Sequence, residues 1–236
     1  IASEAFEEQG RVDDILDKAE QRIFSLSERR LRRGFEFINP ILHKTFDTIE
    51  SYHHRRGSVT GVASGFNDLD EMTSGFQNSD LIIVAGRPSM GKTAFALNVA
   101  THAATKASKK VAFFSLEMPS EQLALRMLAS EAKLDWRRLS AGQLSSYDWQ
   151  KIQTHGDRIC RASIWLDDNF VLTPVDLRSK CRKIWRETGL DLVVVDYLQL
   201  MHAPGLSSRE QEIATISRAL KSLAKELNIP VLGVME

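Results

Sequence analysis

The stretch LIIVAGRPSMGKT, residues 81 to 93, indicates what kind of domain this sequence encodes. Its first five residues, LIIVA, are apolar throughout, and GRPSMGKT at 86–93 matches the pattern G-x-x-x-x-G-K-[ST] in full. The residues that follow, beginning TAFALNVATHAATKA, have the composition of a helix. A strand, a glycine-containing turn and a helix in this order are typical of the phosphate-binding loop, or P-loop.

The residue types in this loop fit the chemistry of holding a nucleoside triphosphate with Mg²⁺. Glycines let the backbone turn so that successive N–H groups point at phosphate oxygens, and the following helix adds its positive N-terminal end. We expect Lys92 to reach the β- and γ-phosphates and Thr93 to offer its hydroxyl to the metal ion. The predicted nucleotide-binding residues are Gly86, Arg87, Pro88, Ser89, Met90, Gly91, Lys92 and Thr93.

A second ligand for the metal is predicted at the end of another apolar strand. In LVVVD at 192–196, four apolar residues precede Asp196. This is the Walker B pattern, in which the aspartate holds Mg²⁺, usually through water. A strand-end aspartate alone would be better explained as the cap of a turn, but beside a complete P-loop the metal role is favoured.

The group that would orient the attacking water is less well defined. Tyr197 follows Asp196, where a glutamate could have stood, so the candidate is Glu117 in VAFFSLEMPS. It comes just past the next predicted strand after the P-loop, and a carboxylate ending a neighbouring strand can lie near the γ-phosphate. On spacing alone, a negative charge for the helix that opens near Ser120 explains Glu117 about as well.

From residue 81 onward the sequence alternates between apolar strands and helices, which is the pattern of the α/β class. Strands are predicted at 81–85, 111–115, 164–167, 192–196 and 231–235, and helices at about 92–106, 120–131, 146–160, 174–187 and 209–227. Strands that are apolar on both faces indicate a mostly parallel sheet that is flanked by helices.

Two further helices are predicted before this alternation. In Val12–Arg33 the apolar residues form a narrow seam of heptad type, which favours docking on a neighbouring subunit over folding back on the same domain. A second helix runs from about Pro40 to Arg56. We therefore predict a docking linker helix within 1–35 and the main domain in 36–236.

The composition sets limits on partners and location. The chain has 31 basic and 31 acidic residues, so any contact with nucleic acid has to come from a local patch. Its two cysteines, Cys160 and Cys181, have no metal or redox spacing, which favours a cytoplasmic protein. No run reaches the roughly 20 apolar residues that span a bilayer. Because the chain begins without methionine and ends on an apolar strand, we expect a piece of a longer protein.

These motifs together resemble the RecA-like ATPases and, within them, the DnaB-type replicative helicases, over nearly the whole chain. SLEM at 115–118 is similar to the family motif that carries the catalytic glutamate, and DYLQLM at 196–201 to its Walker B segment. EIATISRALKSLAKELNIPV at 212–231 resembles the helix and strand that follow. The resemblance implies a RecA-like P-loop NTPase fold, lacking its C-terminal part, with ATP as the nucleotide and Glu117 and Lys92 as catalytic residues.

The resemblance also implies an activity and partners. ATP hydrolysis would drive a homo-hexamer, assembled through the linker helix, along single-stranded DNA, with a primase and a helicase loader as partners. The segment 202–210 is expected to face the central channel, where Arg209 is a candidate DNA-phosphate contact; a helix-start or interface charge is the alternative. The pattern departs at Met235 and Glu236, where the family has Ser-Gln, and the family's arginine finger would lie beyond the last residue.

Two other functions remain open at this point. A RecA-like recombination or repair ATPase shares the P-loop and the glutamate, although it is expected to lack the SLEM and DYLQLM contexts. An assembly module that binds nucleotide only to oligomerise would need no catalytic group.

Overall fold

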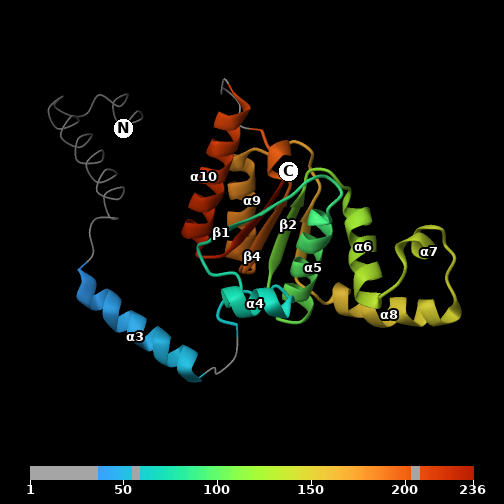
Figure 1. Ribbon diagram of the computed structural model, residues 1–236, viewed down its shortest axis with the longest axis horizontal. Coiled ribbons are helices and arrows are strands. Elements are labelled where there is room, and N and C mark those ends of the chain that lie inside the picture. Colours follow the sequence, from blue (N-terminus) through green and yellow to red (C-terminus); the bar gives the residue numbers. More distant parts are fainter. Residues whose placement is uncertain (1–36, 55–58, 203–207) are drawn as a thin grey trace, which may run out of the picture. The chain divides into compact units, whose positions relative to one another are not determined.

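The chain forms two compact units, residues 1–56 and 57–236. The computed structural model describes residues 37–54, 59–202 and 208–236. Figure 1 gives the labels of the helices and strands in these ranges. The P-loop, Glu117 and Asp196 all belong to the second unit.

Helix α3, Ile38–His54, is the described part of the first unit. It confirms the second of the two early helices, which was predicted from about residue 40 to residue 56. Its large apolar side chains recur every three or four residues and are exposed: Ile38, Ile41, Leu42, Phe46 and Ile49. The helix predicted at 12–33 lies outside the described residues, so the docking linker within 1–35 stays a prediction.

The second unit is built on one sheet of five parallel strands in the order β1-β5-β4-β2-β3. The strands are β1 Leu81–Ala85, β2 Val111–Ser115, β3 Ile164–Asp167, β4 Leu192–Asp196 and β5 Val231–Met235. All five begin and end at the predicted residues. Because they are parallel, their carboxyl ends meet at one edge of the sheet, which is where ligands bind in open α/β folds.

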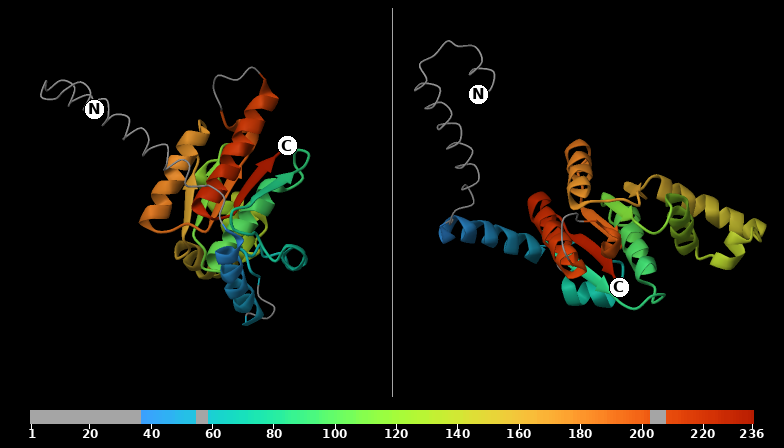
Figure 2. Two further views of the ribbon diagram at one scale, coloured as in Figure 1. Left: turned by 90° about the vertical axis from the view of Figure 1, so that its left-hand side faces the viewer. Right: turned by 90° about the horizontal axis from the view of Figure 1, so that it is seen from above.

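Helices cover both faces of the sheet. Helices α9 and α10 lie on one face, and α5 and α6 lie on the other (Figures 1 and 2). Their bounds are α5 Lys92–Thr105, α6 Ser120–Ala132, α8 Ser146–Cys160, α9 Pro174–Glu187 and α10 Arg209–Leu227. Alternate strand residues serve the two cores: Phe114 packs with α9 and α10, whereas Phe113 packs with α5 and α6. None of the helices in the described ranges is both long and apolar enough to cross a membrane.

Short elements complete the unit: α4 Asn67–Thr73, α7 Trp136–Ser140 and the 3-10 turn η1 Leu198–Leu200. The sequence predicted only loop around α4. Asp70, inside this helix, accepts hydrogen bonds with its carboxylate from the backbone N–H groups of Ser64 (2.8 Å) and Gly65 (3.1 Å) in the preceding loop. A helix of seven residues offers too little hydrophobic periodicity for a sequence pattern to detect.

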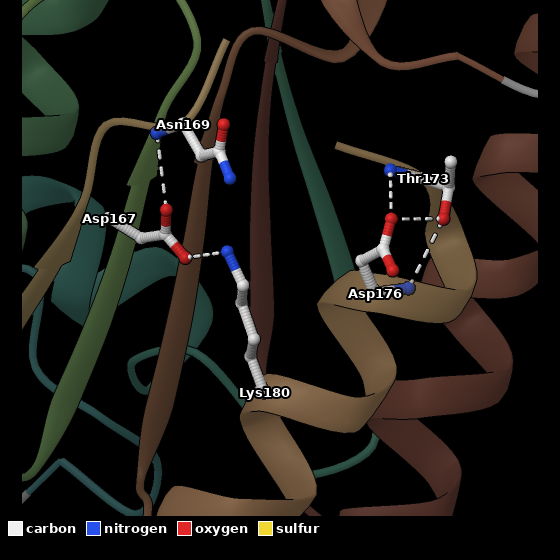
Figure 3. A network of polar contacts seen from close by, with 5 residues as sticks. All are labelled: Asp167, Asn169, Thr173, Asp176 and Lys180. Atoms are coloured by element: carbon white, nitrogen blue, oxygen red, sulfur yellow. Dashed lines mark hydrogen bonds and ion pairs between the residues drawn. The ribbon is translucent and has the colours of Figure 1, made fainter. Parts of the chain in front are cut away.

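Polar contacts fix the edge strand β3 to the helix that follows it. Figure 3 shows Lys180 of α9 pointing back to the carboxylate of Asp167 at the end of β3. Thr173 and Asp176 form a capping box that starts α9. The next residue after the strand, Asp168, reaches across to the start of α6, where its carboxylate accepts a hydrogen bond from the Ser120 N–H (2.8 Å).

Candidate nucleotide-binding site

The P-loop connects β1 to α5 and has the backbone shape that its sequence predicts. Gly91, the residue before α5, has φ +87°, a left-handed conformation that favours glycine. A Cβ placed on Gly91 would meet no heavy atom within 4 Å, so open space lies above this point of the loop. A phosphate group can therefore approach the first turn of α5 closely, where free backbone N–H groups favour an anion.

Lys92 begins helix α5 and folds over the loop. Its Nζ atom donates hydrogen bonds to the carbonyl oxygens of Gly86 (2.6 Å) and Arg87 (3.0 Å). These contacts hold a positive charge against the backbone turn in which a triphosphate would lie. The role predicted for this lysine, which is to neutralise the β- and γ-phosphates, stays a prediction.

Asp196 ends β4 and is fully buried. Neither of its carboxylate oxygens has a hydrogen-bond partner among the described residues. Burial raises the pKa of Asp196 to about 6; the nearby Thr93 hydroxyl opposes this rise, although it does not complete a hydrogen bond, and Glu117 adds to it. A buried carboxylate with two unpaired oxygens beside the P-loop threonine is a fitting ligand for a divalent cation.

A cavity of about 350 Å³ brings the predicted groups together. Among its lining residues are Lys92 and Thr93 from the P-loop, and Glu117 from the turn after β2. Glu117 is exposed to this cavity, whereas its neighbours Leu116 and Met118 are buried. Within the described ranges, no group of three or more acidic, histidine or cysteine residues is placed so that it could hold a metal ion by itself. A metal ion in this site would therefore draw on Thr93, Asp196 and the nucleotide's own oxygens.

Glu117 does not reach this place in the way that was predicted. The strand before Glu117 was expected to neighbour the P-loop strand, and this prediction is wrong because β5 and β4 lie between β1 and β2. Strands that follow each other in the chain are not always adjacent in the sheet. Glu117 instead follows the strand beside the one that carries Asp196.

Three further polar residues line the cavity and had no role assigned from the sequence: Arg126, Tyr197 and Glu236. Arg126 comes from α6, and its guanidinium lies 5.4 Å from the centre of the Trp136 ring. Burial raises the pKa of Tyr197 to about 12, and the nearby Glu117 carboxylate adds to the rise. Tyr197 directly follows Asp196, and this adjacency was the one signal in the sequence that pointed to it.

Arg209 does not line the cavity. It is the first residue of α10 and forms an ion pair with Glu212 one turn later. Most of the segment expected to face a channel, residues 203–207, lies outside the described residues. The DNA contact of Arg209 therefore stays a prediction.

Comparison with known proteins places these motifs in a family. Residues 61–235 match the sequence model of the family described as DnaB-like helicase C terminal domain. The chain is 45% identical to the replicative DNA helicase DnaB of Geobacillus stearothermophilus over 238 residues, and 43% identical to the replicative DNA helicase DnaC of Bacillus subtilis. The match covers 100% of this chain and 52% of each relative, so the chain spans about half the length of these proteins.

Solved structures agree with the sequence matches. The ATPase domain of G40P superimposes with a TM-score of 0.79 at 32% identity, covering 85% of this chain and 71% of the other. A DnaB-like replicative helicase, solved in a study of its interactions with primase, gives a TM-score of 0.75 at 33% identity, covering 85% and 48%. The RecA-like fold is thus common to this chain and both of these structures.

Proposed function

The chain belongs to the DnaB-like helicase C-terminal domain family, and from this premise we propose that it is the ATP-hydrolysing motor of a replicative DNA helicase. In this proposal the protein works as a homo-hexameric ring that moves along single-stranded DNA and unwinds the duplex ahead. The observation that carries the proposal is the cavity in which the P-loop and Glu117 meet, with the unpaired carboxylate of Asp196 beside Thr93.

The loop amides and four side chains of the site each have a place in the hydrolysis of ATP. The loop amides and Lys92 bind the phosphates, while Thr93 and Asp196 hold the metal ion. When bound, Mg²⁺ neutralises negative charge on the β- and γ-phosphates. The carboxylate of Glu117 orients the attacking water and takes its proton. Tyr197 lines the same cavity as Glu117.

The site is favourable for this chemistry because it already holds charges of both signs. Lys92 contributes a cation, and Glu117 and the buried Asp196 contribute carboxylates. Preorganised charges of this kind stabilise a transition state without reorganisation at the moment of reaction. We propose that a neighbouring subunit supplies an arginine finger, a device that accelerates related enzymes about 10³–10⁵-fold.

Partners follow from the same proposal. A primase is suggested by the related helicase whose structure was studied with its primase interactions, and a helicase loader by the need to place a closed ring on DNA. The docking linker within 1–35 and the DNA contact of Arg209 are further parts of the proposal, as is the cytoplasmic location. Family membership and the named relatives favour a replicative helicase over a recombination or repair ATPase.

Strand separation tests the proposal directly. The full-length protein is mixed with a forked DNA duplex, ATP and Mg²⁺, and both phosphate release and the freed strand are measured. We expect ATP-dependent unwinding, with phosphate release stimulated by single-stranded DNA. Nucleotide-dependent oligomerisation without phosphate release would instead identify an assembly module.

A further inference from the structure

The segment that carries Glu117 is held by an unusually placed hydroxyl. Ser115 is the last residue of β2 and is fully buried, in a strand whose other residues, VAFF, are all apolar. Its Oγ atom accepts a hydrogen bond from the Met118 N–H (3.0 Å) and donates one to the Met118 carbonyl oxygen (2.8 Å). One side chain thus satisfies both backbone groups of the residue three positions on, and closes the turn 115–118.

The two residues on either side of Glu117 are anchored in different cores. Leu116 packs in the apolar cluster that includes α9 and α10, whereas Met118 packs in the cluster that includes α5 and α6. Glu117 lies between them and is the exposed residue of the turn. The chain therefore crosses the edge of the sheet at Glu117, with the carboxylate directed into the nucleotide cavity.

Two more hydrogen bonds fix the ends of this segment. The Leu116 N–H donates to the backbone carbonyl of Asp196 (2.7 Å), which ties the turn to the strand of the proposed metal ligand. Beyond the turn, the Ser120 N–H donates to Asp168 (2.8 Å). The Ser115 hydroxyl closes the turn 115–118 through its two bonds to Met118, so removal of this hydroxyl loosens the position of Glu117.

We propose that Ser115 is a positioning residue for Glu117, acting through the turn 115–118 to hold the carboxylate opposite the P-loop. This inference rests on the proposed role of Glu117 as the group that orients water. A displacement of about 1 Å in a reacting group can lower a rate about 10²-fold, so a hydroxyl that never touches the nucleotide can still govern turnover. Nucleotide affinity depends on the P-loop after β1 and is left largely unchanged.

Turnover and nucleotide affinity are compared in the full-length protein for Ser115→Ala and for wild type. We expect the variant's kcat for ATP to fall by about 10- to 100-fold, with the dissociation constant of a fluorescent ATP analogue within about twofold of wild type. The control is Thr101→Val, which removes another buried hydroxyl, bonded to the Leu97 carbonyl within α5. This control is expected to lower the melting temperature without lowering kcat.

A double variant separates positioning from general loss of structure. In the Glu117→Gln background, Ser115→Ala should cause little further loss of kcat, because the group that it positions no longer acts. An equal fold-loss in both backgrounds would overturn the proposal. If Ser115→Ala fails to fold, Ser115→Thr is compared with Ser115→Val, because threonine and valine have the same shape and only threonine keeps the hydroxyl. We expect the higher kcat for Ser115→Thr. Equal kcat values would contradict the proposal.

The turnover of Glu117→Gln alone distinguishes a failure of the role proposed for Glu117 from a failure of the inference about Ser115. Wild-type turnover in that variant would remove the proposed role of Glu117 and, with it, the role of Ser115. Lost turnover in Glu117→Gln together with wild-type kcat in Ser115→Ala would overturn only the inference about Ser115.

Discussion

Ser115 and Asp196 are direct register partners in the parallel strands β2 and β4. Both strands end at this pair, so Glu117, two residues beyond Ser115, emerges at the same sheet edge as the carboxylate of Asp196. Backbone hydrogen bonds therefore set the spacing between the proposed water-orienting group and the proposed metal ligand. The P-loop approaches them from β1, on the far side of β5. Binding and hydrolysis thus depend on different strands, and substitutions should separate them.

Replacement of Lys92 tests binding. Lys92→Ala is expected to abolish measurable ATP binding, because each hydrogen bond between a charged group and its partner contributes about 1.5–3 kcal/mol and the ammonium serves two phosphates. Affinity is measured by isothermal titration calorimetry in the presence of Mg²⁺. The control is Lys106→Ala, at the residue that directly follows the last residue of the same helix. Unchanged nucleotide affinity in Lys92→Ala would contradict the assignment of the P-loop.

Replacement of Glu117 tests hydrolysis. Glu117→Gln should retain ATP binding and lose about 10²–10⁴-fold in turnover, because the amide no longer accepts a proton from water. The measurement is steady-state phosphate release by the full-length protein.

The control for that experiment is Glu121→Gln, in the first turn of α6. Like Glu117, Glu121 is exposed, but it does not line the nucleotide cavity. Its substitution is expected to leave turnover unchanged. Full activity in Glu117→Gln would show that another group orients the water.

The strands could be predicted from sequence because their signal is local. Runs such as LIIVA and LVVVD are bounded by polar residues, and buried parallel strands need no alternation, so all five were found at their observed bounds. Helix α7 was not predicted, since it depends on one cap, in which Asp135 accepts a hydrogen bond from the Arg137 N–H (2.7 Å). A five-residue helix offers too little periodicity for detection.

The site was only partly predictable, for a different reason. Lys92 and Thr93 belong to one continuous motif, so their roles could be proposed directly from the pattern. The order of the strands and the approach of Arg126 to the cavity are tertiary features. They depend on how helices pack over the sheet, and no short stretch of sequence encodes that packing by itself.

Removal of residues 1–33 tests assembly. This deletion removes the narrow apolar seam predicted in Val12–Arg33, which is the surface expected to bind a neighbouring subunit. Sedimentation velocity is therefore expected to show a shift toward smaller species. Removal of residues 1–10, which precede the seam, is the control and should leave the distribution unchanged. An intact oligomer after removal of 1–33 would contradict the docking of this helix.

The pH dependence of stability tests the state of Asp196. Its pKa is raised from 3.8 to about 6 in the folded chain, chiefly by burial. Folding therefore favours the protonated carboxyl, and the stability that this proton contributes is present below about pH 4 and lost as the pH rises through about 6. The shift of about two pKa units corresponds to about 3 kcal/mol. Asp196→Asn, which stays neutral, should not show this loss.

The free energy of unfolding is measured by urea titration from pH 4.5 to 7.5, without Mg²⁺ or nucleotide, for wild type and for Asp196→Asn. The difference between the two proteins cancels the contributions of other carboxyls to the pH dependence. Asp168 is one of these: the hydrogen bond from Ser120 lowers its pKa, so its contribution to stability has the opposite sign. We expect the stability of Asp196→Asn relative to wild type to increase by about 2 kcal/mol across this range. Added Mg²⁺ should reduce this difference in free energy of unfolding at pH 7.5, because an ion bound to the wild-type carboxylate offsets the cost of burying its charge. A difference that stays constant with pH would mean that Asp196 is ionised at no cost, and the case for a cation at this position would lose its main physical support.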